Sequence, residues 1–285
     1  MIEWLVTPLT YEFMQRGLLA SLMVGVICAV VGCYVILRSM AFLGDAMAHA
    51  ILPGVAVAYL LQGNLVVGAL VAAVAVALGI GFFSRQGTIK EDTAIGIMFA
   101  ASLALGVALI STIRTYAVDL SHILFGNVLG VSTADLWLTA GLGVVVLTTI
   151  VLLYKEFLVI SFDPILAATL RLPIELLRNV MLILLALTIV ISLQTVGVGL
   201  VTAMLVTPAA TAYLLTRRLP AMMALSALFG ALSALVGLYL SFYANIASGP
   251  AIVLVCTFFF LLTFLFSPQQ GLLKQKLQSR NVHPS

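Results

Sequence analysis

Long apolar segments alternate with short polar connections along nearly the whole chain. A helix that crosses a bilayer needs about 20 predominantly apolar residues, and the segments are close to that length. The least secure boundary is Gly197-Val198-Gly199, where a kink or a re-entrant turn would change the count. The pattern predicts about nine membrane-spanning helices, with eight to ten as the range, at residues 14–37, 41–61, 65–83, 94–112, 134–154, 179–196, 199–215, 221–243 and 250–267.

The composition supports an all-α polytopic membrane protein. Of 285 residues, 63% are hydrophobic and 8% are charged, and the mean hydropathy is +1.25. Soluble domains carry about 25% charged residues. We expect a transmembrane domain over residues 1–267 and a polar tail over 268–285. Acidic Glu3 and Glu12 stand where a signal peptide would be basic, so we expect no removable signal peptide.

The basic residues predict the orientation. With the N-terminus outside, one side keeps only Arg16 and Arg114 of the 13 lysines and arginines. Such an imbalance marks the richer side as cytoplasmic. We therefore expect an external N-terminus and a cytoplasmic C-terminus, with these basic residues inside: Arg38, Arg85, Lys90, Lys155, Arg171, Arg178, Arg217, Arg218, Lys274, Lys276 and Arg280.

Two ionisable residues lie within the second apolar segment. Asp45 and His49 are four residues apart, which places them on one face of a helix. Ionisable groups inside a membrane are costly and indicate function. A carboxylate and an imidazole are suitable ligands for a divalent transition metal. A proton relay, or a structural hydrogen bond that joins two helices, is the alternative.

The connection 155–178 is too apolar for a solvated linker. Asp163 followed by Pro164 is typical of a helix start, and Pro173 would close off a short helix over residues 165–170. This helix would expose Ile165, Leu166 and Leu170. Such a face fits equally a segment lying on the membrane or a docking element for a soluble partner.

Four stretches in this order resemble bacterial ABC importer permeases for manganese, zinc and iron. The first has the form GDA-x-x-HA-x-LPG, and the resemblance covers about residues 12–267 and favours the manganese branch. The stretches are Gly44–Gly54, Ile89–Gly96, Leu124–Asn127, and Gln194–Gly197 continuing into Leu200–Ala210.

The resemblance implies a membrane subunit that pairs with a second copy of itself, binds two cytoplasmic ATPase subunits and receives metal from an external or periplasmic receptor. It implies a bacterial cytoplasmic membrane, no nucleic-acid partner and no permanent cofactor, with the metal ion as substrate at Asp45 and His49. It also favours docking by the segment 155–178. In this loop, where many members of the family have a glycine, the chain has Arg171. The implied ATPase-contacting residues are Phe162, Asp163, Pro164, Ile165, Leu166, Leu170, Arg171 and Pro173.

Other polar positions are weaker candidates. Thr202, Thr207 and Pro208 lie in the seventh apolar segment, where proline frees a backbone carbonyl and could shape the pathway. His122 lies on the outer side, where it could meet an incoming cation.

The source of energy separates the leading function from its rival. The sequence has no GxxxxGK[ST] loop, so we expect no ATPase activity of its own and ATP hydrolysis by a partner. The alternative is a secondary cation/proton transporter that uses Asp45 and His49. Such transporters commonly show internal repeats, and no convincing repeat relates the halves of this chain.

Overall fold

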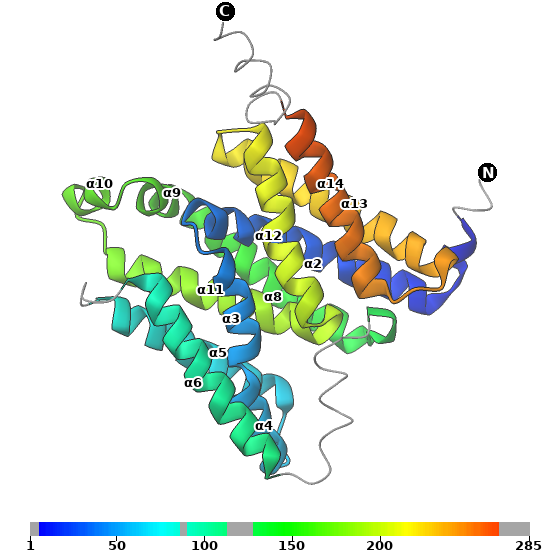
Figure 1. The fold of residues 1–285 in the computed structure, drawn as a ribbon, viewed down its shortest axis with the longest axis horizontal. Coiled ribbons are helices and arrows are strands. Elements are labelled where there is room, and N and C mark those ends of the chain that lie inside the picture. The colour runs from blue at the N-terminus through cyan, green and yellow to red at the C-terminus, as the bar shows by residue number, and fades with distance from the viewer. Residues whose placement is uncertain (1–5, 86–89, 113–127, 268–285) are drawn as a thin grey trace, which may run out of the picture.

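The computed structural model describes residues 6–85, 90–112 and 128–267. The short 3-10 helices η1 (Thr7–Thr10) and η2 (Val128–Gly130) accompany a bundle of α-helices (Figure 1). The α-helices are α2 (Glu12–Leu37), α3 (Ala41–Ala50), α4 (Leu52–Leu60), α5 (Leu65–Arg85), α6 (Glu91–Ser111), α8 (Thr133–Leu152), α9 (Tyr154–Phe162), α10 (Pro164–Thr169), α11 (Ile174–Val196), α12 (Val198–Leu215), α13 (Leu219–Ala244) and α14 (Ser248–Phe266).

The predicted number of spans is confirmed. Nine helical segments of the described residues are long and apolar enough to cross a membrane. The second of them, Ala41–Leu60, is bent and comprises α3 and α4. The sixth begins at Ile174, five residues before the predicted start at 179. Gly197, with a φ of 84°, is the single residue between α11 and α12, so the uncertain boundary is a true break.

Local sequence explains several helix ends. Ser132 and Asp135 form a reciprocal capping box at the start of α8, in which each side chain accepts a backbone N–H of the other residue. Helix α13 stops where Asn245 adopts a left-handed conformation with φ 52°. Asparagine tolerates that conformation better than most residues.

The centre of the bundle is close-packed through glycine. A Cβ atom on Gly32 of α2 would lie 1.8 Å from the Leu205 carbonyl oxygen of α12. A Cβ on Gly25 of α2 would lie 3.0 Å from the Gly230 oxygen of α13. Small residues of this kind let membrane helices approach backbone to backbone. Helices α2, α12 and α13 therefore form one tightly packed group.

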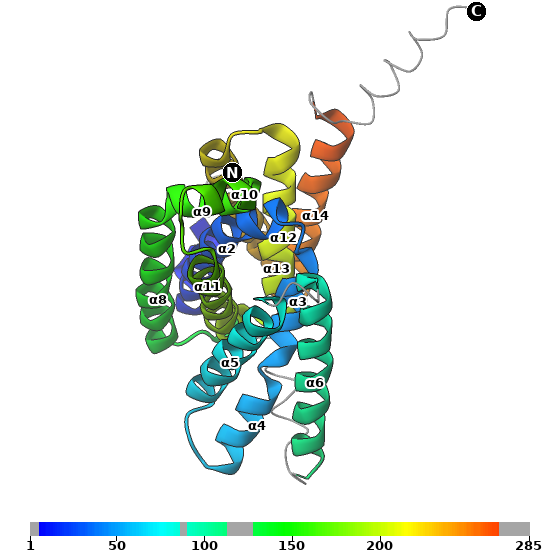
Figure 2. The ribbon, with the colours of Figure 1, turned by 90° about the vertical axis from the view of Figure 1, so that its left-hand side faces the viewer.

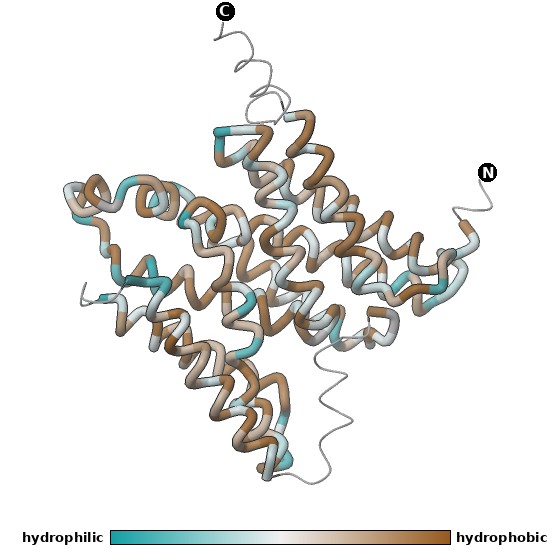
Figure 3. The backbone as a smooth tube through the Cα atoms, viewed as in Figure 1, coloured by the Kyte–Doolittle hydropathy of each residue, from teal (hydrophilic) through white to brown (hydrophobic). Residues whose placement is uncertain are grey.

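Helices α4, α5 and α6 form a second group that extends from one end of the molecule (Figures 1 and 2). A Cβ on Gly54 of α4 would lie 2.1 Å from the Gly68 oxygen of α5, so these helices also touch through their backbones. Most residues of the helices are apolar, whereas hydrophilic residues interrupt α3 in the middle of the molecule (Figure 3). The polar positions of α3 are therefore the candidate site.

Candidate functional site

Helix α3 has one buried face and one polar open face. Leu43, Gly44, Ala46, Met47, Ala48 and Ala50 are buried. The accessible positions form a stripe along the helix, which we call the α3 stripe: Ala41, Phe42, Asp45 and His49. The spacing of four residues therefore places Asp45 and His49 together, and tertiary packing leaves this face of the helix open.

A tight turn places the stripe a short distance into the span. Ser39 adopts a left-handed conformation with φ 58°, and the N–H groups of Ser39 and Met40 donate to the carbonyls of Ile36 and Val35. This arrangement ends α2 and lets α3 begin at Ala41. Given the helical rise, Asp45 and His49 lie about 6 and 12 Å from the start of α3. The pair thus occupies the half of the second span that is nearer to Arg38.

The glycines and the proline of the motif around the pair have structural roles. A Cβ on Gly44 would lie 2.7 Å from the Leu205 side chain, so this glycine brings α3 against α12. Pro53 lacks the N–H that would bond to the His49 carbonyl in a continuous helix, and the chain bends at Ile51 between α3 and α4. The motif therefore both supplies the two polar side chains and shapes the helix that carries them.

The two polar side chains are close and accessible. His49 Nε2 lies 3.8 Å from Asp45 Oδ1, and the side chains are 28% and 44% exposed. Two ligand atoms on one metal ion, each about 2.1 Å from it, are separated by about 3 to 3.5 Å. A small side-chain adjustment would therefore let both atoms bind one ion. The described residues contain no group of three or more histidine, cysteine, aspartate or glutamate residues placed to hold a metal.

The pair does not form the structural hydrogen bond between two helices in this structure. A separation of 3.8 Å is too long for a hydrogen bond, and both residues belong to α3, so they do not join two helices. The metal-ligand and proton-relay interpretations both remain compatible with this geometry.

Two phenylalanines that the sequence did not single out lie beside the pair. The ring of Phe99 on α6 meets those of His49 and Phe42 edge to face, at centroid distances of 6.1 and 5.9 Å. Phe42 could have been found from its helical spacing to Asp45 and His49. Phe99 belongs to a distant segment and gave no such signal. The aromatic rings make one side of the α3 stripe apolar.

The weaker candidates lie on α12 or outside the described residues. Helix α12 continues through the buried Pro208 without a break. Its Thr202 hydroxyl donates to the Gly199 carbonyl at 3.2 Å, and the Thr207 carbonyl accepts the Thr211 hydroxyl. These contacts are internal to α12, and a role in the pathway stays a prediction. His122 lies outside the residues that the structure describes.

The connection 155–178 contains the predicted short helix. Asp163 Oδ1 accepts the N–H groups of Ile165 and Leu166, each at 2.9 Å, which confirms the predicted start of α10. The side chain of Ile165 is 78% exposed, whereas Ala167 is fully buried. The other large apolar side chains of the region are also exposed: Phe162, Leu166 and Leu170. Helix α10 thus presents an open apolar face.

The end of α10 differs from the prediction. Arg171 adopts φ 55°, and the N–H groups of Arg171 and Leu172 donate to the carbonyls of Ala168 and Ala167. This is the turn that glycine favours, so arginine occupies the glycine-like position without changing how the helix ends. Pro173 does not close off α10; it immediately precedes α11.

The fold and the open polar stripe define a polytopic membrane transport subunit. Ionisable side chains on an intramembrane helix are costly and seldom face lipid. The chain belongs to the ABC 3 transport family, whose sequence profile matches residues 10–267. It is thus a multi-pass permease subunit of the bacterial cytoplasmic membrane, and its class is not enzymatic.

Individual relatives agree over nearly the whole chain. It is 50% identical to the manganese transport system membrane protein MntC of Halalkalibacterium halodurans, covering 93% of this chain and 91% of that protein. It is also 50% identical to MntC of Listeria monocytogenes, covering 93% of this chain and 95% of that protein. A solved structure, PsaBC from Streptococcus pneumoniae in complex with Fab, matches with a TM-score of 0.84 at 40% identity, over 97% of this chain and 100% of that chain.

Proposed function

We propose that this chain is the permease subunit of an ATP-driven importer that moves a divalent transition metal, with manganese as the first candidate, into the cytoplasm. The observation that carries the proposal is the α3 stripe, on which Asp45 and His49 are 44% and 28% exposed within a membrane span. A conduit must bind its ion strongly enough to admit it and weakly enough to release it. Two ligands from one chain satisfy the second requirement.

The metal follows from ligand chemistry and from the relatives. Carboxylate oxygen suits manganese, and imidazole nitrogen is accepted by manganese, zinc and iron. The two MntC relatives, each 50% identical to this chain, are described as manganese transport proteins. Manganese is therefore our first candidate, and zinc or iron comes next.

A second copy of the chain would complete the site. If two α3 stripes face each other across a two-fold axis, two Asp45 carboxylates and two His49 imidazoles surround the ion. The same contact would remove the polar stripe from lipid. This arrangement explains why one chain exposes a polar intramembrane face.

ATP hydrolysis is assigned to a partner that docks on α10. The exposed apolar face of α10, centred on Ile165 and Leu166, suits a groove of an ATPase subunit. In this arrangement the segment 155–178 and the tail 268–285 are cytoplasmic, the N-terminus is outside, and an external receptor delivers the metal. Membership of an ABC transport family disfavours the secondary cation/proton transporter.

The function is tested with the chain reconstituted together with its ATPase and receptor in proteoliposomes. ATP hydrolysis and uptake are compared for manganese, zinc and iron. Asp45→Ala and His49→Ala should abolish uptake while the ATPase subunits still bind. Glu12→Ala, which removes an exposed carboxylate at the far end of α2, is the control and should retain uptake. Normal uptake by both site variants would contradict the proposal.

A further inference from the structure

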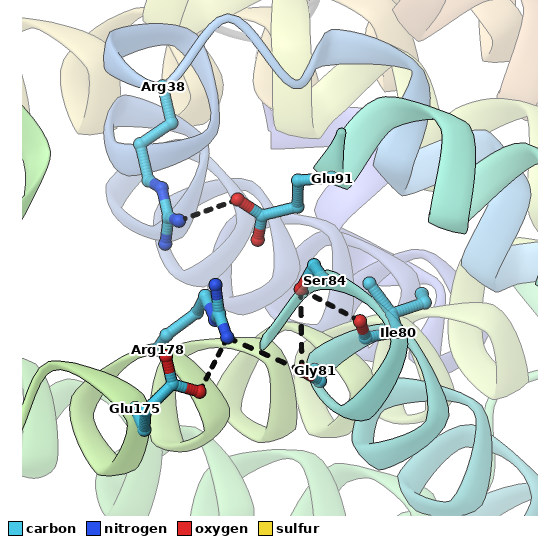
Figure 4. A network of polar contacts seen from close by, with 7 residues as sticks. All are labelled: Arg38, Ile80, Gly81, Ser84, Glu91, Glu175 and Arg178. Carbon is cyan, nitrogen blue, oxygen red and sulfur yellow. Dashed lines mark hydrogen bonds and ion pairs between the residues drawn. The ribbon is translucent and has the colours of Figure 1, made fainter. Parts of the chain in front are cut away.

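A cluster of charged residues lies where α2, α5, α6 and α11 meet (Figure 4). Arg38, directly after α2, donates from Nη2 to Glu91 Oε2 at the start of α6, at 2.9 Å. The two side chains are only 14% and 20% exposed. Pairs as enclosed as this resist screening by salt more than surface pairs do.

A second arginine faces this pair from α11. Arg178 Nη2 donates to Glu175 Oε2 at 2.6 Å and to the Gly81 carbonyl of α5 at 3.3 Å. Its side chain extends from α11 toward the Arg38–Glu91 pair (Figure 4). Burial lowers the pKa of Arg38, the charge of Glu91 raises it, and the nearby charge of Arg178 lowers it again. The two guanidinium groups are therefore close enough to repel each other.

The cluster is not saturated with hydrogen bonds. Among the described residues, no partner reaches Arg38 Nη1, Glu91 Oε1 or Arg178 Nε, although all three atoms are buried. A partly satisfied buried network is less favourable than a fully paired one. Donors remain on both arginines and an acceptor remains on the glutamate between them. The cluster thus has the groups for a second pairing in which Glu91 binds Arg178.

The position of the cluster connects the two ends of the proposed mechanism. Arg38 stands three residues before α3, which carries Asp45 and His49. Arg178 lies in the second turn of α11, which follows α10 after a short connection. A Cβ on Gly81 would lie 2.1 Å from Asn179 Oδ1, so α5 and α11 are tightly joined. The glycine contacts of α2 join it instead to α12 and α13. The charged cluster therefore bridges the pair α5 and α11 and the group of α2, α12 and α13.

We propose that Arg38, Glu91 and Arg178 are positioning residues that transmit movement of α10 to the α3 stripe by exchange of the Glu91 partner. When Glu91 pairs with Arg38, α6 is tied to the turn before α3. When a displacement of α10 and α11 brings Arg178 to Glu91, that tie is released and α3 moves relative to α6. The proposal rests on the proposed function, in which an ATPase acts on α10 and metal passes the α3 stripe.

The test measures manganese uptake and ATP hydrolysis in parallel in the reconstituted complex of permease, ATPase and receptor. Arg38→Gln and Arg178→Gln should leave ATP hydrolysis near the wild-type rate and lower manganese uptake per ATP about tenfold, a typical size for coupling between two sites. Arg38→Lys keeps the charge and should recover most of the ratio. Arg16→Gln removes the exposed Arg16–Glu12 pair at the other end of α2 and should leave both rates unchanged.

Two outcomes overturn the proposal while leaving the proposed function intact. One is a wild-type ratio of uptake to hydrolysis in Arg38→Gln and Arg178→Gln. The other is loss of assembly in both glutamine variants together with failure of Arg38→Lys to recover the ratio, which would make the cluster a structural anchor only. A wild-type complex that takes up none of the three metals contradicts the proposed function, and this proposal falls with it.

Discussion

Single residues determine how closely α3 and α4 approach their neighbours. Gly44 brings α3 to Leu205, and Gly54 brings α4 to the backbone of Gly68. Neither glycine has a positive φ, so the need is for space and not for an unusual backbone conformation. The close approach at Gly44 thus helps to fix which face of α3 packs against α12 and which face, with Asp45 and His49, stays open.

Substitution of Gly54 tests this role. In Gly54→Ala the new Cβ would lie 2.1 Å from a backbone oxygen, which no side-chain movement relieves. Overpacking costs about 1–3 kcal/mol, whereas alanine gains about 1 kcal/mol of helix propensity over glycine. We expect overpacking to win and the midpoint of thermal unfolding in detergent to fall.

Gly141→Ala is the matched control. A Cβ on Gly141 of α8 meets nothing within 4 Å, so only the propensity effect remains and the midpoint should stay or rise. A rise in both variants would show that the contact between α4 and α5 is looser than the structure indicates.

At the scale of an element, α10 illustrates how much a short helix depends on its ends. A helix of six residues is too short to be stable by propensity alone. Its N-terminus is fixed by the Asp163 side chain and its C-terminus by the turn at Arg171. Both ends are therefore points at which the proposed docking of an ATPase on α10 can be tested without touching the apolar face.

Asp163→Ala removes the side chain that accepts two backbone N–H groups. Loss of such a cap costs about 1 kcal/mol, which corresponds to about a fivefold change in an equilibrium constant. We expect the affinity of the permease for its ATPase to fall by about that factor in a titration in detergent. Asp163→Asn preserves the cap and should bind normally. Equal losses in the two variants would indicate that charge, and not capping, matters at this position.

Arg171 tests the other end of α10. Arg171→Gly relieves the left-handed conformation but adds freedom to the unfolded chain, an opposing effect of about 0.4–1 kcal/mol. We expect unchanged or slightly higher thermal stability and normal uptake. Arg171→Val places a β-branched residue at φ 55° and should lower stability. If the valine variant is as stable as the wild type, the turn does not hold the conformation seen here.

At the scale of the whole molecule, the polar α3 stripe needs a cover, because ionisable side chains are costly in contact with lipid. Helices α2 and α11 are central, because 67% of the residues in the most apolar stretch of each helix are buried. In the peripheral helices α8 and α14 the corresponding share is 22%. The accessible side of α3 is polar, whereas the accessible side of α8 is apolar and suits lipid. A second copy of the chain placed against α3 would cover the polar stripe and leave the apolar side of α8 facing lipid.

A cysteine cross-link tests that placement. Phe42 is 51% exposed on the α3 stripe, and Val151 is 71% exposed on α8. The native Cys28, Cys33 and Cys256 are buried and should not react. In membranes treated with a short thiol-specific cross-linker, Phe42→Cys should give a covalent dimer and Val151→Cys should remain monomeric. Cross-linking through Val151→Cys alone would place the dimer contact on α8 and contradict a contact through the α3 stripe.

The sequence by itself determined the features that depend on nearby residues. Hydrophobic length predicted nine spans, Asp163-Pro164 predicted the start of α10, and the spacing of Asp45 and His49 placed them on one helical face. Each of these follows from the geometry of a single helix or from the thickness of a bilayer.

Only the tertiary structure decided which face of α3 is open and which distant groups meet there. The Phe99 ring beside His49 and the cluster of Arg38, Glu91 and Arg178 both depend on contacts between helices far apart in sequence. In an almost uniformly apolar chain, hydrophobicity does not distinguish lipid from a neighbouring helix. The packing of small residues and the few buried charges make that choice.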